Sequence, residues 1–118
     1  MTTYCFDLDG TLCTDTDGKY DQALPLPEMI EEVNKLKAEG HNIIIFTARG
    51  SATGIDWRAV TTAQLARWGV AYDSLILGKP AADVYVDDKC VNVSGFRLAR
   101  LGKLKPDSPP AIFRCQPD

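Results

Sequence analysis

Hydrophobic residues recur with two different periods along this chain. Short apolar runs at Thr3–Leu8 and Ile43–Phe46 are typical of β-strands, and the second is continuous enough for a strand covered on both faces. Between them, apolar residues recur at helical spacing, which predicts a helix from Pro27 to Glu39 that stops at Gly40. The positions of this apolar face are Leu26, Met29, Ile30, Val33 and Leu36.

The second half of the chain continues the alternation of strands and helices. A helix is expected from Asp56 to Trp68, with Gly69 closing it and Trp57, Val60, Leu65 and Trp68 facing the sheet. Two further strands are predicted at Ser74–Leu77 and Asp83–Val86. This order predicts an α/β fold: a Rossmann-like, doubly wound parallel sheet with helices on both faces.

Turn and breaker residues divide the rest. Asp17-Gly18 is a strong hairpin signal and predicts a small β-hairpin flap after the first strand. Residues 1–102 are expected to form one domain. Residues 103–118 carry four prolines and are expected to be a loosely ordered tail, or an arm that packs on another subunit.

Composition narrows the function. The chain has 118 residues and a formal net charge of −3, so it offers no general attraction to nucleic acid or to anionic membranes. No signal-like segment or run of about 20 apolar residues is present, so the cytoplasm is the expected location. The four cysteines lack zinc spacing and are expected to be free, mostly buried thiols.

Polar residues gather where the predicted strands end, which is the edge at which parallel sheets bind ligands. They are Asp7 and Asp9 after the first strand, Thr47 after the second, Lys79 between the third and fourth, and Asp87 and Asp88 after the fourth. Four carboxylates with one lysine leave uncompensated negative charge, which a hard divalent cation such as Mg²⁺ would neutralise. Thr47 and Lys79 offer a hydroxyl and an ammonium to an anion.

Phosphoryl transfer explains this set of residues, because its catalysis consists mostly of positioning and charge neutralisation. Asp7 is expected to attack phosphorus and form an aspartyl phosphate. Asp9 is expected to protonate the leaving oxygen and then to deprotonate the water that cleaves the intermediate.

Four segments, DLDGTL, FTAR, GKP and VYVDD, resemble the motifs of the haloacid dehalogenase (HAD) superfamily of phosphatases in their order along Phe6–Asp88. The resemblance implies that Asp7 is nucleophile and metal ligand, and that Asp9 is acid/base and binds metal through its carbonyl. It further implies metal ligation by Asp87, with Asp88 ligating or orienting through water. The phosphate-binding residues that it implies are Leu8, Gly10, Thr47, Ala48 and Lys79.

The family often inserts a cap domain, but the gaps between these motifs are too short for one. Size and motif spacing are similar to small HAD phosphatases of bacterial capsule and surface-polysaccharide clusters, which implies a sugar phosphate or related small metabolite. An open site also suits a macromolecule, or a small substrate enclosed by neighbouring subunits of a homo-oligomer. Candidates for contacting the substrate are Arg49, Lys19, Tyr20 and Arg58.

Other aspartate-rich or phosphate-binding motifs fit less well. EF-hand loops placed on Gly10 or Gly18 would need an acid at Thr16 or Leu24. A P-loop around Lys79 would need Ser or Thr where Pro80 stands. Receiver domains place their acidic pair before the lysine, whereas here an acidic pair follows it.

Two rival functions stay open: a catalytically idle binding or assembly module, and a phosphatase of protein or nucleic acid.

Overall fold

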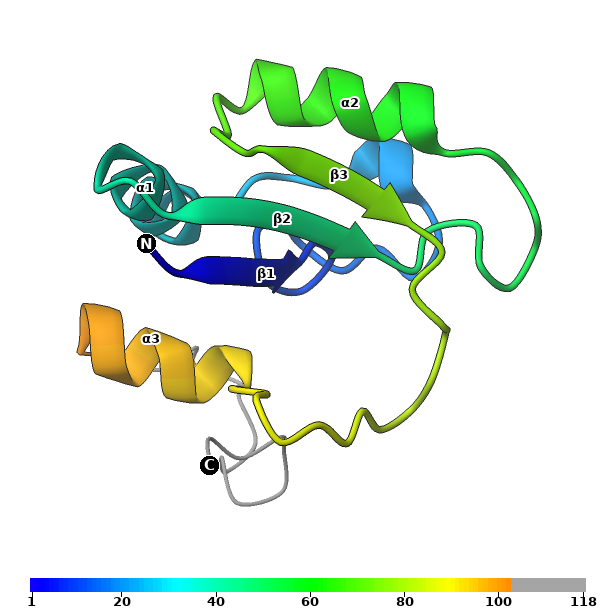
Figure 1. The fold of residues 1–118 in the computed structure, drawn as a ribbon. Coiled ribbons are helices and arrows are strands. Elements are labelled where there is room, and N and C mark those ends of the chain that lie inside the picture. Colours follow the sequence, from blue (N-terminus) through cyan, green and yellow to red (C-terminus); the bar gives the residue numbers. More distant parts are fainter. Residues whose placement is uncertain (103–118) are drawn as a thin grey trace. The chain divides into compact units, whose positions relative to one another are not determined.

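Three parallel strands form the sheet in the computed structural model, which describes residues 1–102 (Figure 1). They are β1 (Thr3–Asp7), β2 (Asn42–Thr47) and β3 (Ser74–Leu77), in the order β1-β2-β3. The chain divides into two compact units, Met1–Ala81 and Ala82–Asp118, and each is described by itself. The predicted tail, 103–118, lies outside the described residues.

Helices α1 (Pro27–Ala38) and α2 (Arg58–Arg67) connect the strands, as predicted. Proline suits the first turn of α1 because no intrahelical partner exists there for an N–H group. Both crossovers step in the same direction across the sheet, so right-handed connections place both helices on one face. A direct contact joins α1 to the segment that follows α2. The Asn34 side chain of α1 donates to the Gly69 carbonyl at 2.8 Å and accepts from the Ala71 N–H at 2.7 Å. No cap domain is inserted between these elements.

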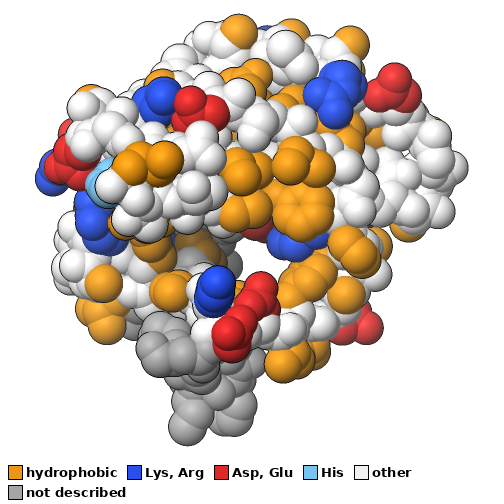
Figure 2. Space-filling view, in the orientation of Figure 1, with side chains coloured by type: hydrophobic (Ala, Val, Ile, Leu, Met, Phe, Trp, Pro, Cys, Tyr) orange, Lys and Arg blue, Asp and Glu red, His pale blue; other side chains and the backbone are white. Residues whose placement is uncertain are grey.

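The two faces of the sheet differ in burial. The strand register aligns Phe6 with Ile45, and both side chains are buried, as is Ile43 on the same face. The opposite face carries Ile44, Phe46 and the 44% exposed Ile76, and Figure 2 shows apolar side chains gathered over β2 and β3. Within residues 1–81 this second face is therefore only partly covered, because α1 and α2 share the other one.

An exposed ion pair and a hydrogen bond, both made by Asp73, connect α1 to the start of β2. The Asp73 carboxylate accepts from the Ile43 N–H at 2.7 Å and from Lys37 Nζ at 2.8 Å. The Lys37 hydrogen bond, followed by the Ile43 hydrogen bond, lowers the pKa of Asp73. The charged carboxylate is thus favoured in the folded state.

Asp73→Asn is expected to lower the melting temperature at neutral pH, because the neutral amide loses the charge that Lys37 and Ile43 stabilise. A carboxylate with a lowered folded pKa stabilises the protein above its unfolded pKa, and this stabilisation is lost as pH falls through the folded pKa. The difference in melting temperature between wild type and variant should therefore shrink below about pH 4. The exposed Asp21, replaced by Asn, is the control. A difference that is constant with pH would contradict this account.

The flap between β1 and α1 contains the predicted turn but only one short antiparallel pairing. Asp17 and Gly18 have φ angles of 54° and 92°, and the Lys19 N–H closes the turn on the Thr16 carbonyl at 3.2 Å. At the base, residues 12–14 pair antiparallel with residues 24–26. A 3₁₀-helix, η1 (Tyr20–Gln22), stands where the second hairpin strand was expected.

The second unit corrects the predictions for residues 82–102. The strand expected at Asp83–Val86 was wrong: the segment is irregular, with Val84 and Val86 exposed by 75% and 94%. A strand needs a hydrogen-bonded neighbour, and no described residue pairs with this segment. A helix that was not predicted, α3 (Val93–Leu101), follows it.

Local signals for α3 are nevertheless present in the sequence. The Asn92 side chain caps the helix by accepting from the Gly95 N–H at 2.6 Å, and Gly102 ends it with φ of 72°.

The prediction of free, mostly buried cysteines holds only in part: Cys13 is a buried free thiol, Cys5 is free but exposed, and Cys90 is disulfide-bonded. None of the helices in residues 1–102 is long and apolar enough to cross a bilayer.

Candidate active site

The carboxyl ends of the three strands bring together Asp7, Lys79 and the main chain of Thr47. The Thr47 side chain is buried, and its Oγ1 accepts from the Arg49 N–H at 3.1 Å. Asp7 is the last residue of β1, Thr47 is the last of β2, and Lys79 follows β3 by two residues. Lys79 Nζ lies 3.4 Å from Asp7 Oδ1, and the Lys79 N–H donates to the Thr47 carbonyl at 3.1 Å. Parallel strands alone explain this convergence, because all their carboxyl ends meet at one edge.

The Asp7 carboxylate is only partly sheltered, with 37% of its side chain exposed. Burial raises its pKa, whereas the Lys79 charge and the hydrogen bond from the Leu8 backbone oppose that rise. The repulsion from Asp9 adds a smaller upward contribution. Asp7 is therefore both accessible and electrostatically dependent on Lys79.

A tight loop follows β1 and fixes the direction of Asp9. The Leu8 carbonyl accepts from the N–H groups of Thr11 and Leu12, at 3.1 and 2.8 Å. Gly10 has φ of 86°, a conformation that favours glycine, and its N–H donates to the Cys13 carbonyl at 2.8 Å. Two of the residues expected to bind phosphate lie in this loop. The Gly10 N–H is engaged within the loop, and the side chain of Leu8 is fully buried.

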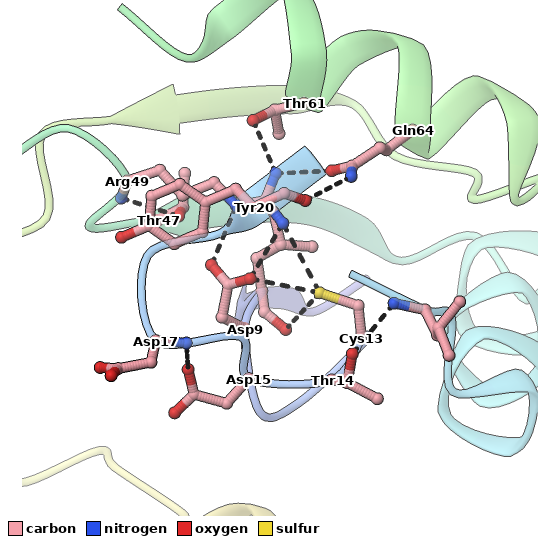
Figure 3. Close-up of polar contacts among 12 residues, drawn as sticks. Asp9, Cys13, Thr14, Asp15, Asp17, Tyr20, Thr47, Arg49, Thr61 and Gln64 are labelled. Atoms are coloured by element: carbon pink, nitrogen blue, oxygen red, sulfur yellow. Dashed lines mark hydrogen bonds and ion pairs between the residues drawn. The ribbon is translucent and has the colours of Figure 1, made fainter. Parts of the chain in front are cut away.

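Arg49 forms the most connected polar contact near this loop (Figure 3). Its Nε donates to Asp9 Oδ2 and its Nη2 to Asp9 Oδ1, both at 2.9 Å. Its Nη1 donates to Thr61 Oγ1 at 3.0 Å and to Gln64 Oε1 at 2.6 Å, and its Nη2 also contacts Cys13 Sγ at 3.7 Å. These five contacts use all five N–H groups of a guanidinium.

This arrangement differs from the substrate clamp expected of Arg49. Its side chain is 0% exposed and has no N–H left for a substrate phosphate. The spacing of residues along β2 indicates that the Arg49 side chain points inward. Every second residue is buried, and the buried residues are Ile43, Ile45, Thr47 and Arg49. Arg49 thus continues the buried face of β2 beyond the end of the strand.

The thiol of Cys13 completes the surroundings of Asp9. Its Sγ lies 3.4 Å from Asp9 Oδ1, and the residue is fully buried. Burial first, and then the nearby negative charge of Asp9, raises the pKa of Cys13 to about 12. The side chain is therefore a neutral thiol that can donate to the carboxylate, and not a nucleophilic thiolate.

Among the flap residues expected to contact the substrate, Tyr20 lies nearest to Asp9. Its ring centroid is 4.8 Å from Arg49 Cζ and 5.0 Å from the ring of Trp57, which packs against it edge-on. The Gln64 amide holds the Tyr20 carbonyl at 2.6 Å. Trp57 is thus half-buried against the flap, and not in the core under the sheet.

The other predicted substrate and phosphate contacts are more peripheral in residues 1–81. Lys19 is exposed in the flap, and Arg58 Nη1 donates to the Leu75 carbonyl at 3.4 Å. The Ala48 carbonyl accepts from the Ser51 N–H at 2.9 Å, and Ser51 Oγ donates to the Lys79 carbonyl at 2.6 Å. The loop after β2 is thus hydrogen-bonded to the Lys79 segment.

Asp87 and Asp88 belong to the second unit, so their approach to Asp7 stays a prediction. Asp87 Oδ1 accepts from the Lys89 N–H at 3.0 Å, and this hydrogen bond is the main cause that lowers the pKa of Asp87. In the described part of the chain, no group of three or more His, Cys, Asp and Glu side chains is placed to hold a metal ion.

The chain is similar to several known proteins in sequence and fold. The sequence profile for haloacid dehalogenase-like hydrolases matches residues 4–59. A protein of known structure from Vibrio cholerae is 32% identical, with a TM-score of 0.74 over 81% of this chain and 87% of that one. A chain of the Pnkp1/Rnl/Hen1 RNA repair complex is 26% identical, with a TM-score of 0.52 over 70% of this chain and 26% of that one.

The fold is also shared with D,D-heptose 1,7-bisphosphate phosphatase from B. bronchiseptica, whose structure was determined with magnesium and phosphate. The two chains are 22% identical, with a TM-score of 0.53 over 77% of this chain and 55% of that one.

Proposed function

We propose that this chain is a haloacid dehalogenase-like hydrolase and, within that family, a Mg²⁺-dependent phosphomonoesterase whose nucleophile is Asp7. The observation that supports this most is the 3.4 Å contact between Asp7 and Lys79 where three parallel strands end. A carboxylate that is partly exposed and paired with a lysine can approach a phosphate monoester, while the lysine neutralises the charge of the phosphate oxygens.

In the first step, an Asp7 carboxylate oxygen forms a bond to phosphorus as the bond to the leaving oxygen breaks. Asp9 gives its proton to that oxygen, so the alcohol departs neutral. In the second step, Asp9 takes a proton from water, the water oxygen bonds to phosphorus, and the bond from Asp7 to phosphorus breaks. Inorganic phosphate leaves, and both aspartates return to their starting forms.

The donor atoms present suit Mg²⁺, which prefers oxygen ligands and retains several waters. Each carboxylate oxygen of Asp9 accepts one hydrogen bond from Arg49, and its remaining lone pairs are needed for proton transfer, so its main-chain carbonyl is the donor that it would contribute to the ion. We propose that the Asp7 carboxylate, this carbonyl and Asp87 hold the ion, with Asp88 ligating directly or through water. When bound, the ion would neutralise phosphate charge and favour the ionised form of Asp7.

As the substrate we propose a sugar phosphate or a related small metabolite, of the kind used in surface-polysaccharide synthesis. The net charge of −3 gives no general attraction to nucleic acid, and the gaps between the motifs are too short for a cap domain. The flap with Tyr20, or a second subunit of a homo-oligomer, would then enclose the leaving group.

A phosphate-release screen over sugar phosphates, nucleotides and 4-nitrophenyl phosphate tests the proposal. We expect hydrolysis with added Mg²⁺, complete loss with excess chelator, and recovery when Mg²⁺ is restored. Selective turnover of sugar phosphates would support the substrate class, and selective turnover of nucleotides would reject it. Absence of turnover across the whole panel with Mg²⁺ present would instead favour a catalytically idle binding or assembly module.

A further inference from the structure

The guanidinium of Arg49 is fully buried and held from two directions. On one side it grips both carboxylate oxygens of Asp9, each at 2.9 Å. On the other side Nη1 is fixed to Thr61 and Gln64 of α2. A planar group with every N–H engaged cannot turn without breaking several hydrogen bonds, so the direction of Asp9 is tied to the position of α2.

We propose that Arg49 is a positioning residue that holds Asp9 for proton transfer to the leaving group, an inference that rests on the proposed function. Proton transfer requires a donor oxygen within hydrogen-bonding reach of the leaving oxygen. Asp9 is on a loop after β1, and outside this loop Arg49 supplies the side-chain contacts that fix its carboxylate (Figure 3). When Asp9 gives up its proton, the resulting carboxylate has a bidentate cationic partner already in place.

The hydrogen bonds of Arg49 also extend to the flap. Gln64 bridges Arg49 Nη1 and the Tyr20 carbonyl, at 2.6 Å on both sides, and the Tyr20 ring lies over the guanidinium. Arg49 therefore lies between α2, the flap and Asp9. A lysine at this position would keep the charge but not the bidentate geometry.

The test compares kcat/KM for two aryl phosphates that differ in leaving group. 4-Nitrophenolate leaves readily without a proton, whereas the leaving group of phenyl phosphate depends much more on protonation by Asp9. We expect Arg49→Met to lower kcat/KM for phenyl phosphate about tenfold or more beyond its effect on 4-nitrophenyl phosphate. Arg49→Lys should show a smaller bias of the same sign, and the exposed Arg67→Met should show none.

A double-mutant cycle separates positioning from a general structural role. In an Asp9→Asn background no proton can be given, so adding Arg49→Met should produce no further leaving-group bias. Should Arg49→Met fail to fold, as judged by its thermal unfolding, Gln64→Leu carries the test, because it removes an anchor of Arg49 without touching Asp9. We expect the same bias there, in weaker form.

Equal losses on both substrates in the folded variants would overturn the positioning role while leaving the phosphatase proposal intact. A further bias on the Asp9→Asn background would overturn it as well. A wild-type protein that hydrolyses neither substrate would reject the proposed function itself, and the inference with it.

Discussion

Replacing Asp7 by asparagine is expected to lower the rate of phosphate release by at least about 10³-fold, which makes it the most damaging single substitution in the site. The amide has nearly the same size but is a very weak nucleophile and cannot form the aspartyl phosphate. It also leaves Lys79, 3.4 Å away, without the negative charge of its partner. The measurement is the initial rate on 4-nitrophenyl phosphate with saturating Mg²⁺.

The control for this substitution is Asp21→Asn, which removes an exposed aspartate of the flap and should keep wild-type activity. Thermal unfolding of both variants shows whether the fold is retained. Phosphate release by a folded Asp7→Asn variant at a rate close to wild type would reject Asp7 as the nucleophile.

Replacing Lys79 by methionine is expected to lower kcat by about 10²-fold at neutral pH, because a cation that neutralises phosphate charge is lost. The loss should be larger at acid pH. Burial raises the pKa of Asp7, and Lys79 is the strongest influence that opposes this rise. Without Lys79 the pKa of Asp7 rises further, and Asp7 attacks phosphorus only as a carboxylate, so the acid limb of the pH profile should move to higher pH.

Lys79→Arg is the matched control, since it keeps a positive charge near Asp7. Its acid limb should stay near that of wild type even where its rate is reduced by altered geometry. The comparison requires full profiles of kcat against pH for the three proteins. An acid limb that does not move in Lys79→Met would show that Lys79 does not control the ionisation of Asp7.

The sequence predicted the elements that position the centre of the site. Helical spacing gave α1, and it also gave α2, which begins at Arg58 with Trp57 as its N-cap and not Asp56. The apolar runs gave all three strands of the sheet. Because these strands are parallel, the residues at their carboxyl ends lie at one edge of the sheet. The 3.4 Å contact between Lys79 Nζ and Asp7 Oδ1 is found at this edge. The family match covers residues 4–59 and therefore includes the DLDGTL and FTAR segments.

Segments that depend on a distant partner were predicted less well. The run Asp83–Val86 has the composition of a strand, but a strand exists only where another chain segment satisfies its hydrogen bonds. In the flap, η1 stands where a second hairpin strand was expected, and Gln64 of α2 donates there to the Tyr20 carbonyl. Helix α3 was missed although its two end signals, Asn92 and Gly102, are local.

By itself, the sequence determined which residue types could perform the chemistry and at which end of the sheet they lie, because strand periodicity and parallel topology follow from local pattern. Only the tertiary structure decided that Arg49 binds Asp9 and not a substrate. That choice depends on Thr61 and Gln64, which α2 brings from 12 and 15 residues away to satisfy a buried cation. Burying such a charge is favourable only when its partners are in place, and their placement is a property of the packed fold.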